Sequence, residues 1–424
     1  MKCTATNDSL QSEAQVTRGP GGRILTNTAV WSPDSEWIVY DTRSDAAGEK
    51  FDGNRIEMVN VRSGEVRVLY ESRNGAHCGV ATFHPREARV VFILGPENPT
   101  PDWSYNAYHR QGVIVDTAKP GVAMNLDARD LVPPFTPGAL RGGSHVHVWD
   151  PAGERVSFTY EDHVLAQSGL NQRNIGVSVP GRPIAVPKTH PRNHNGNYFT
   201  VLVTRTTANP KPGSDEIKKA FEEGWVDQRA LAFQGHVVTE KGETISEVFI
   251  VNLPDDLTQL GDGPLAGTET RMPSPPCGVT QRRLTFTIGR KYPGIQGPRH
   301  WLRSSPDGSR IAFLMKDDAG VAQLWTVLPN GGSPAQLTHN PWPIASAFTW
   351  SPNGQRIAYM MDNSVCVTDA ATGETMRLTP RSDDTSSPRP EACVFSPDGT
   401  KITFVRRVPS PDAPANQVFV VNVK

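Results

Sequence analysis

Short apolar runs separated by turn residues recur along the chain, and the clearest unit spans residues 298–340. Four apolar runs of strand length alternate there with Ser-Pro-Asp-Gly, Lys-Asp-Asp and Asn-Gly-Gly segments. Proline, aspartate and glycine favour tight turns, so each pair of neighbouring runs is predicted to form an antiparallel hairpin. Four strands in about 45 residues correspond to one blade of a propeller.

Imperfect copies of this unit begin near residues 30, 80, 145, 198, 298, 346 and 393. The seventh copy ends one strand short, and Gln15-Val16-Thr17 near the N-terminus resembles Gln336-Leu337-Thr338 and Arg377-Leu378-Thr379, which end two other copies. A strand supplied by the N-terminus would pair the open sheet edge. The sequence therefore predicts an all-β fold: a seven-bladed β-propeller of four-stranded antiparallel blades, closed by an N-terminal strand.

The fourth copy departs from the pattern, because it lacks the Ser-Pro-Asp-Gly turn. Its inner strand is predicted at 198–203. After it, residues 214–225 combine an N-terminal serine, early acids and apolar residues at helical spacing, which predicts a short helical insertion. We expect a disordered tail at 1–13 and a single domain at 14–424, with insertions at about 206–228 and 253–280.

The composition of the 424 residues excludes several functions. A net charge of −1 offers no basic field for nucleic acid or for an anionic membrane surface. No apolar run is long enough to span a membrane. Five cysteines without paired spacing indicate free thiols, and the polar N-terminus shows no apolar signal segment, so a cytoplasmic location is expected.

Aligning the copies with one another predicts which side chains meet at the mouth of the central channel. Counting six residues back from each turn proline reaches the same end of each inner strand, at Asn27, Gly79, His145, His300, Ser346 and Glu391. The repeat itself does not require histidine there, since other copies use Asn, Gly or Ser.

Two further histidines lie two residues from these positions and are expected on the same side of their strands. Imidazole together with carboxylate oxygen suits Mn, Fe, Ni or Zn. We predict a divalent-metal site whose ligands come from His77, His145, His147, His300 and Glu391. The alternative is that each histidine is an ordinary core or surface residue of its strand.

The recurring Trp-Ser-Pro-Asp-Gly-x-x-Ile-Ala-Phe pattern resembles the WD40-like repeats of TolB-type propellers. Nearly the whole chain also resembles the DUF3748 family. The segments that carry this resemblance are Leu25-Thr26-Asn27-Thr28, Gly75-Ala76-His77, Gly95-Pro96-Glu97-Asn98-Pro99, Arg141-Gly142-Gly143-Ser144-His145-Val146-His147, Gly213-Ser214-Asp215-Glu216-Ile217, Glu222-Glu223-Gly224-Trp225 and Gln281-Arg282-Arg283-Leu284-Thr285-Phe286-Thr287. The family resemblance implies the propeller fold and no particular activity.

The repeat type and the cluster of His and Arg are also similar, more distantly, to those of oligogalacturonate lyases. That resemblance implies a divalent metal at the channel mouth and β-elimination on a small carbohydrate-acid substrate, assisted by a His and an Arg. In this chain the implied base is His163 or His194, and the implied carboxylate clamp is Arg141 or Arg299.

Two function hypotheses follow. The first is a metal-dependent, lyase-like enzyme acting on a small anionic or carbohydrate-derived substrate. The second is a non-catalytic TolB-like propeller that binds a protein or peptide on its top face. An enzyme predicts clustered ionisable groups at the channel mouth, whereas a scaffold predicts an apolar rim; the self-alignment favours the enzyme. Trp103, in a polar segment, is predicted to be exposed and able to stack on a sugar ring.

Overall fold

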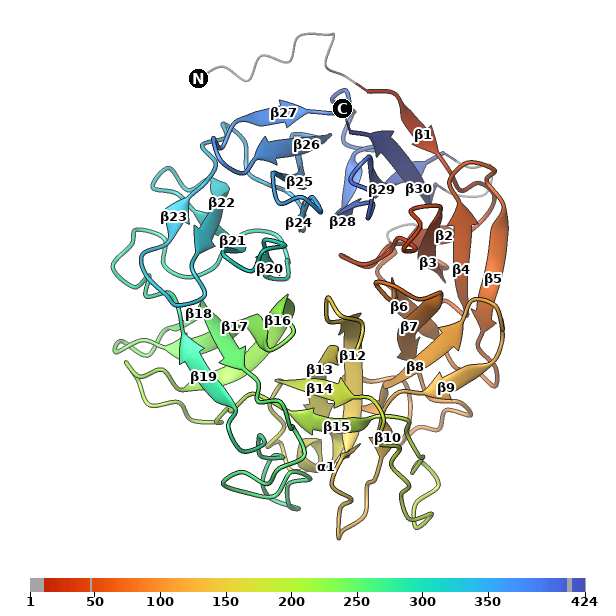
Figure 1. Cartoon of the computed structure of the whole chain (residues 1–424), viewed down its shortest axis with the longest axis vertical. Helices are drawn as coiled ribbons and strands as arrows, with labels where there is room; N and C mark the ends of the chain where they lie inside the picture. Colours follow the sequence, from red (N-terminus) through yellow and green to blue (C-terminus); the bar gives the residue numbers. More distant parts are fainter. Residues whose placement is uncertain (1–10, 46–47, 410–413, 424) are drawn as a thin grey trace.

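In a computed structural model that describes residues 11–45, 48–409 and 414–423, seven four-stranded antiparallel sheets surround a central axis (Figure 1). Blade 1 contains β2 (Gly22–Ile24), β3 (Trp37–Arg43), β4 (Arg55–Asn60) and β5 (Val66–Glu71). Blade 2 contains β6 (Cys78–Phe83), β7 (Arg89–Leu94), β8 (Gln111–Asp116) and β9 (Ala123–Asn125). Blade 3 contains β12 (Gly142–Trp149), β13 (Val156–Asp162), β14 (Asn174–Val179) and β15 (Phe199–Leu202).

The second half of the ring repeats this order. Blade 4 contains β16 (Ile217–Asp227), β17 (Ala230–Val238), β18 (Thr244–Asn252) and β19 (Thr280–Arg283). Blade 5 contains β20 (Arg303–Ser304), β21 (Ile311–Lys316), β22 (Ala322–Val327) and β23 (Ala335–Gln336). Blade 6 contains β24 (Thr349–Trp350), β25 (Arg356–Met361), β26 (Ser364–Asp369) and β27 (Thr375–Arg377). Blade 7 contains β28 (Pro388–Phe395), β29 (Lys401–Val408), β30 (Ala415–Asn422) and the N-terminal β1 (Glu13–Gln15).

Few elements lie outside the blades. A two-stranded parallel sheet joins β10 (Ala128–Arg129) to β11 (Ala139–Leu140). A 3-10 turn, η2 (Ala107–His109), and one short helix, α1 (His163–Ala166), decorate blades 2 and 3. Among the described residues, no helix has the length and apolar character needed to cross a membrane. Cys78, Cys277 and Cys393 are free thiols, Cys366 is buried in β26, and Cys3 lies outside the described residues.

The predicted Ser-Pro-Asp-Gly turn forms as a side-chain-capped hairpin. In blade 5 the Ser305 hydroxyl donates to Asp307 Oδ1 at 2.6 Å and accepts from the Arg310 amide at 3.0 Å. The same two hydrogen bonds recur from Ser32 in blade 1, Ser351 in blade 6 and Ser396 in blade 7. Because this bonding is local, the turn is readable from sequence.

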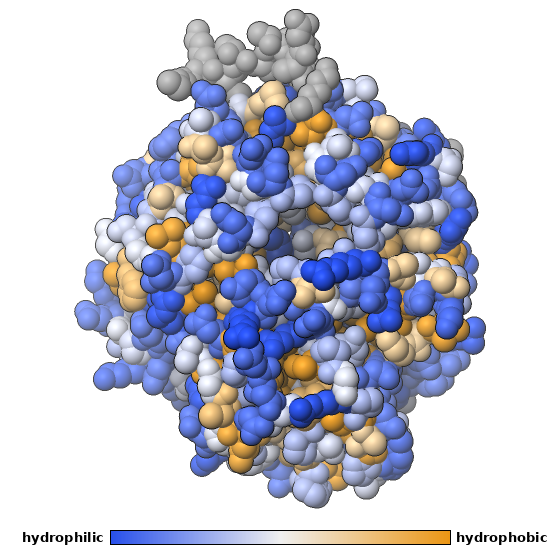
Figure 2. Space-filling view, viewed as in Figure 1, coloured by the Kyte–Doolittle hydropathy of each residue, from blue (hydrophilic) through white to orange (hydrophobic). Residues whose placement is uncertain are grey.

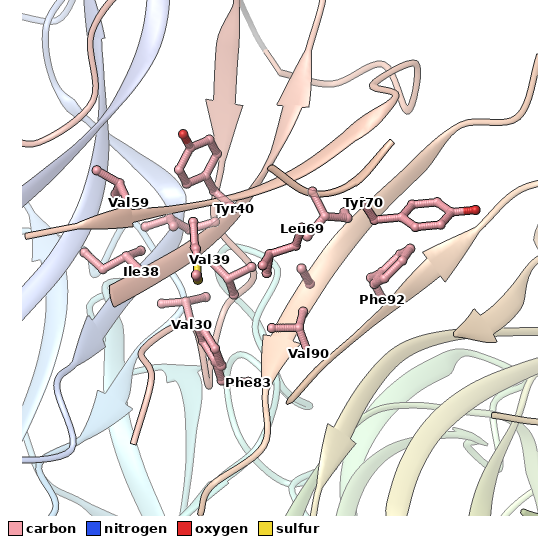
Figure 3. Close-up of a cluster of buried hydrophobic side chains, with 14 of the residues drawn as sticks. Val30, Ile38, Val39, Tyr40, Val59, Leu69, Tyr70, Phe83, Val90 and Phe92 are labelled. Carbon is pink, nitrogen blue, oxygen red and sulfur yellow. The ribbon is translucent and has the colours of Figure 1, made fainter. Parts of the chain in front are cut away.

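Hydrophobic side chains fill the spaces between neighbouring blades. The cluster between blades 1 and 2 contains Val39, Leu69, Phe83 and Phe92, all almost fully buried, and Figure 3 shows them converging from both sheets. Since each blade can bury its faces only against its neighbours, the ring has to close for the last cluster to be complete.

A buried threonine helps to close the ring, and a threonine holds the equivalent position at the end of two other blades. The Thr17 hydroxyl, just after β1, donates to Gln417 Oε1 and accepts from the Val418 amide, both at 2.8 Å. Thr338 and Thr379 accept from amides of β22 and β26 in the same way. The predicted closure of the last blade by an N-terminal strand is therefore confirmed. The strand itself, β1, lies two residues earlier than residues 15–17.

Replacing Thr17 by valine is expected to destabilise the protein by about 1–3 kcal/mol, because a buried amide and a buried amide oxygen lose their partner. Thr17→Ser keeps the hydroxyl and is expected to cost less than about 1 kcal/mol, the value of one methyl group. Urea unfolding midpoints of the two variants measure the difference. Equal midpoints would show that the hydroxyl does not hold the ring closed.

The predicted helix at 214–225 is wrong, because this stretch is β16, the inner strand of blade 4. Register shifts follow Ile217, Phe221 and Trp225, and each inserts extra residues. The apolar residues Ile217, Ala220, Phe221 and Trp225 then fall three, one and four residues apart, which imitates the spacing of a helix.

Two strand assignments move with this correction. Residues 199–202 are not the inner strand of blade 4 but β15, the outer strand of blade 3. The sequence pattern also predicts the fourth strand of blade 3 at 184–186, which is wrong because β15 is that strand. Residues 1–10 of the predicted tail lie outside the described residues, and Glu13 belongs to β1.

Candidate functional site

Three inner strands carry a β-bulge at the same end, and each bulge holds a non-glycine residue with positive φ. These residues are Val80 in β6 (φ 58°), Val146 in β12 (φ 58°) and Glu222 in β16 (φ 54°). A β-branched residue in the left-handed region is an outlier, and such backbone strain gathers at functional sites. The three bulges therefore indicate that a functional site lies at this end of the ring.

Val80 and Val146 line a cavity of about 470 Å³, a size typical of small-molecule sites. Blades 1, 2, 3, 5 and 7 all contribute to its wall, so the cavity lies where the blades converge. Its lining includes Asn27, Asp41, Phe51, Tyr105, Arg110, His145, Arg299, Trp301 and Glu391. In the view of Figure 2, hydrophilic residues gather around a hollow at the middle of the ring.

His145 is the imidazole of this pocket. It is partly exposed, and its ring makes no hydrogen bond with any other described residue. Burial holds the pKa of His145 well below its ordinary value, and the guanidinium groups of Arg110, Arg173 and Arg299 lower that pKa further. An anion bound among these positive charges would raise the pKa of His145 and favour its protonated form.

Arg110 and Arg299 are positioned to receive that anion. Arg110 Nε donates to the Tyr105 hydroxyl at 2.9 Å, and Arg299 Nε donates to Glu222 Oε1 at 2.8 Å. Within the described part of the chain, the terminal nitrogens of both side chains have no hydrogen-bond partner. Each guanidinium is thus fixed through Nε and presents its remaining N–H groups, the arrangement that binds a carboxylate.

A buried ion pair supports the strained wall of the pocket. Asp41 accepts from Arg43 Nε at 2.7 Å and from the Val80 amide at 3.0 Å. Burial raises the pKa of Asp41, and the adjacent Arg43 lowers it. A Cβ added at Gly79 would lie 2.7 Å from Asp41 Oδ2, which explains why glycine occupies that position at the channel mouth.

The structure brings only part of the predicted metal set together. His145 and Glu391 line the pocket. His300 is 2% exposed, its Nδ1 contacts the Pro298 carbonyl at 2.8 Å and its Nε2 accepts from the Leu314 amide at 3.1 Å. His147 is buried and contacts Ser144 Oγ at 3.0 Å, and His77 does not line the pocket.

These residues do not fit a metal ion as they are arranged. Both nitrogens of His300 are engaged by the backbone, and among the residues that the structure describes no three His, Cys, Asp or Glu side chains form a metal-binding group. A divalent metal and its identity remain predictions from the sequence.

Of the predicted catalytic residues, only Arg299 lines this pocket. Arg141 is fully buried: Nε pairs with Asp162 at 2.8 Å, and both terminal nitrogens donate to backbone carbonyls of Thr268 and Arg271. All three nitrogens of its guanidinium are bonded within the fold and the side chain is 1% exposed, so a ligand cannot reach it.

The two predicted bases lie elsewhere. His194 precedes the segment predicted as the inner strand of blade 4, which is the outer strand β15 of blade 3. The backbone of His194 forms an isolated β-bridge with Arg129 of β10. His163 opens α1 and lines a separate pocket. Trp103, predicted to be exposed, is only 6% exposed and packs beside His163.

Sequence reasoning missed the aromatic wall and one arginine. Phe51 and Tyr105 stack with ring centroids 4.5 Å apart, and Arg299 lies over the Trp301 ring. Arg110 lies in the connection between the second and third strands of blade 2. An arginine in such a connection is the sequence signal that points to it.

Comparison with known proteins places the chain in a family. A family model described as a protein of unknown function, DUF3748, matches residues 77–194. Over 397 residues the chain is 52% identical to the uncharacterized protein YidR of Escherichia coli K12, covering 92% of this chain and 94% of that protein. The chain belongs to the DUF3748 family. The segment of this DUF3748 protein that the family model matches contains Arg110 and His145 of the pocket.

Solved structures share the fold at low sequence identity. An oligogalacturonate lyase in complex with manganese aligns with a TM-score of 0.60 and 10% identity, over 98% of this chain and 93% of that one. Oligogalacturonate lyase from Vibrio parahaemolyticus gives 0.58 and 9%, over 100% and 96%. TolB from Acinetobacter baumannii gives 0.40 and 15%, over 87% and 76%. The similarity to the two lyases establishes the propeller fold and no activity.

Proposed function

We propose that this DUF3748 protein binds a small carboxylate-bearing ligand of the carbohydrate-acid class in the channel-mouth pocket and acts on it as a lyase. The observation that carries the proposal is His145, a neutral imidazole without a hydrogen-bond partner among the described residues, next to Arg110 and Arg299. The fold shared with oligogalacturonate lyases supports the same reaction class.

In such an elimination, Arg110 and Arg299 would bind the substrate carboxylate and stabilise the charge that develops when the neighbouring C–H bond breaks. His145 would take that proton, and the bound carboxylate would favour the protonated imidazole. The C–H electron pair then forms the new carbon–carbon double bond while the bond to the leaving oxygen breaks. The Tyr105 hydroxyl accepts a hydrogen bond from Arg110 Nε and keeps its own proton, which it would donate to the leaving oxygen.

No step in this scheme passes through a metal, since the arranged side chains do not fit one. The bases inferred from the lyase resemblance, His163 and His194, are replaced by His145 because neither lines the pocket. Binding of a protein or peptide partner, and a cytoplasmic location, remain predictions from the sequence; no observation at the described surface favours a macromolecular partner.

Calorimetric titration with galacturonate and digalacturonate tests the binding step. We expect the Arg299→Gln variant to bind at least tenfold more weakly than the unmodified protein, because one charge-assisted contact is lost. Arg55→Gln, which breaks an exposed ion pair on blade 1, is the matched control and should bind normally. Galactose, which lacks the carboxylate, should not bind in this pocket.

The chemical step is tested with His145→Gln and digalacturonate. We expect this variant to retain binding and to lose the ultraviolet absorbance that the unsaturated product gains. If the unmodified protein binds galacturonate but forms no unsaturated product, the lyase assignment fails and only the anion site stands. If galacturonate and digalacturonate do not bind, the proposal fails as a whole.

A further inference from the structure

A second pocket, of about 610 Å³, lies beside α1 and is built by loops of blades 2 and 3. Its lining residues are Asn98, Thr100, Asp102, Trp103, His163, Gln167, His190, Pro191 and Arg192. None of these residues lines the channel-mouth pocket. The second pocket is therefore separate from the channel-mouth pocket.

Hydrogen bonds fix which nitrogen of His163 carries its proton. His109 Nδ1 lies 2.7 Å from the Ser104 carbonyl, and a carbonyl can only accept, so Nδ1 of His109 is the protonated nitrogen. In the neutral ring, His109 Nε2 is then an acceptor, and it lies 3.0 Å from His163 Nδ1. His163 Nδ1 must donate, which leaves His163 Nε2 with a free lone pair.

In His190, hydrogen bonding fixes the proton on the other ring nitrogen, Nε2. The Arg192 amide donates to His190 Nδ1 at 3.1 Å, so the neutral His190 ring carries its proton on Nε2. In the described part of the chain, neither His190 Nε2 nor His163 Nε2 has a hydrogen-bond partner. The pocket thus presents one imidazole acceptor and one imidazole donor.

Both rings stay neutral near pH 7. Burial and then His109 lower the pKa of His163 to about 4. Burial and then Arg192 lower the pKa of His190, and burial lowers that of His109. Arg129 also lowers all three pKa values. The donor and acceptor pattern therefore persists at physiological pH.

Trp103 holds these rings in place. Its indole stacks on His109 with centroids 3.7 Å apart, and the centroids of His163 and His190 lie 4.8 and 6.2 Å away. Arg192 lies near the same indole and anchors its terminal nitrogens on the carbonyls of Glu97 and Asn98. A site ordered before binding loses little conformational entropy when a ligand arrives.

We propose that this pocket is a second ligand site, which binds a neutral, hydroxyl-bearing molecule of the sugar class. One ligand hydroxyl donates to His163 Nε2, and a second ligand oxygen accepts from the N–H of His190 Nε2. A carboxylate can only accept, so it cannot satisfy His163. This assignment does not rest on the proposed function of the channel-mouth pocket.

The first test is nuclear magnetic resonance of the full chain with ¹⁵N-labelled histidine. Long-range proton–nitrogen spectra are expected to show the proton of His163 on Nδ1 and that of His190 on Nε2. Titration with methyl β-galactoside, a neutral sugar, should shift both imidazoles and leave His145 unchanged. The opposite tautomer at either ring, or no shift at either with the sugar near saturation, overturns the proposal.

A variant supplies the second test. His163→Phe removes the acceptor and should weaken methyl β-galactoside binding about tenfold, the effect of one lost hydrogen bond to a ligand hydroxyl. His339→Asn, at an exposed histidine in blade 5, is the matched control and should bind normally. Unchanged affinity in His163→Phe overturns the assignment. Arg299→Gln should leave this binding intact, which separates the two pockets.

Discussion

Replacing Arg141 by alanine is expected to destabilise the protein by about 3–5 kcal/mol, the range found when one partner of a buried ion pair is removed. Arg141 and Asp162 are 1% and 0% exposed at their side chains, with Nε and Oδ2 2.8 Å apart. Without Arg141, the Asp162 carboxylate stays buried with too few partners. Two backbone carbonyls, of Thr268 and Arg271, also lose their donors.

The effect should appear as a lower urea midpoint with an unchanged slope. Arg141→Lys keeps the charge but cannot reach all three acceptors at once, so its stability should lie between those of alanine and arginine. Arg55→Ala, which removes an exposed ion pair with Glu71, should cost less than about 1 kcal/mol. If Arg141→Ala costs no more than Arg55→Ala, Arg141 is not a structural residue and its assignment as a ligand clamp is open again.

The architecture was predictable because its signals are local and repeated. The turn at Ser305 is held by its own neighbours, Asp307 and Arg310, so it can be read wherever the pattern recurs. Thr17 could be matched to Thr338 and Thr379 because all three make the same bond to an adjacent strand. Blade 4 was misread where bulges broke the two-residue period of β16.

For the candidate site, the sequence predicted which residues lie at the channel-mouth end of each inner strand, but not where their side chains point. Counting from the turn proline placed Asn27, His145 and Glu391 at the channel mouth, and all three line the pocket. The direction of side chains was not predictable, because it depends on the bulges. His145 and His147 are two residues apart and were expected on one side, but the bulge at Val146 separates them, and His147 is buried against Phe158.

The second pocket could not be predicted from the repeats in the sequence. His109, His163 and His190 come from three separate loops, and no repeat position relates them. Their chemistry depends on which carbonyl or amide lies beside each ring nitrogen, which only the folded backbone decides.

Replacing Glu223 by glutamine is expected to stabilise the protein above neutral pH. Glu223 in β16 is 2% exposed; its Oε2 accepts from the Thr159 hydroxyl at 2.9 Å, and its buried Oε1 has no hydrogen-bond partner. Burial and, less strongly, the neighbouring Glu222 raise the pKa of Glu223 to about 7, against the opposing effects of the Thr159 hydrogen bond and of Arg303. The folded chain therefore favours the protonated carboxyl, which glutamine imitates.

The sign follows from linkage between protonation and folding. A carboxyl whose folded pKa exceeds its ordinary value of 4.5 contributes its full stability below that value and loses it as the pH rises through about 7. A difference of this size corresponds to about 3 kcal/mol. Urea unfolding should therefore show Glu223→Gln close to the unmodified protein at acidic pH and up to that much more stable under alkaline conditions.

Glu240→Gln, at an exposed position in the hairpin that follows β17, is the control and should show no such pH dependence. The decisive quantity is the change with pH in the stability difference between Glu223→Gln and the unmodified protein. A constant difference would mean that the pKa of Glu223 is the same in the folded and unfolded states, and that Arg303 compensates for its burial. A difference that grows with pH would identify Glu223 as a carboxyl kept protonated beside the Glu222–Arg299 pair of the pocket.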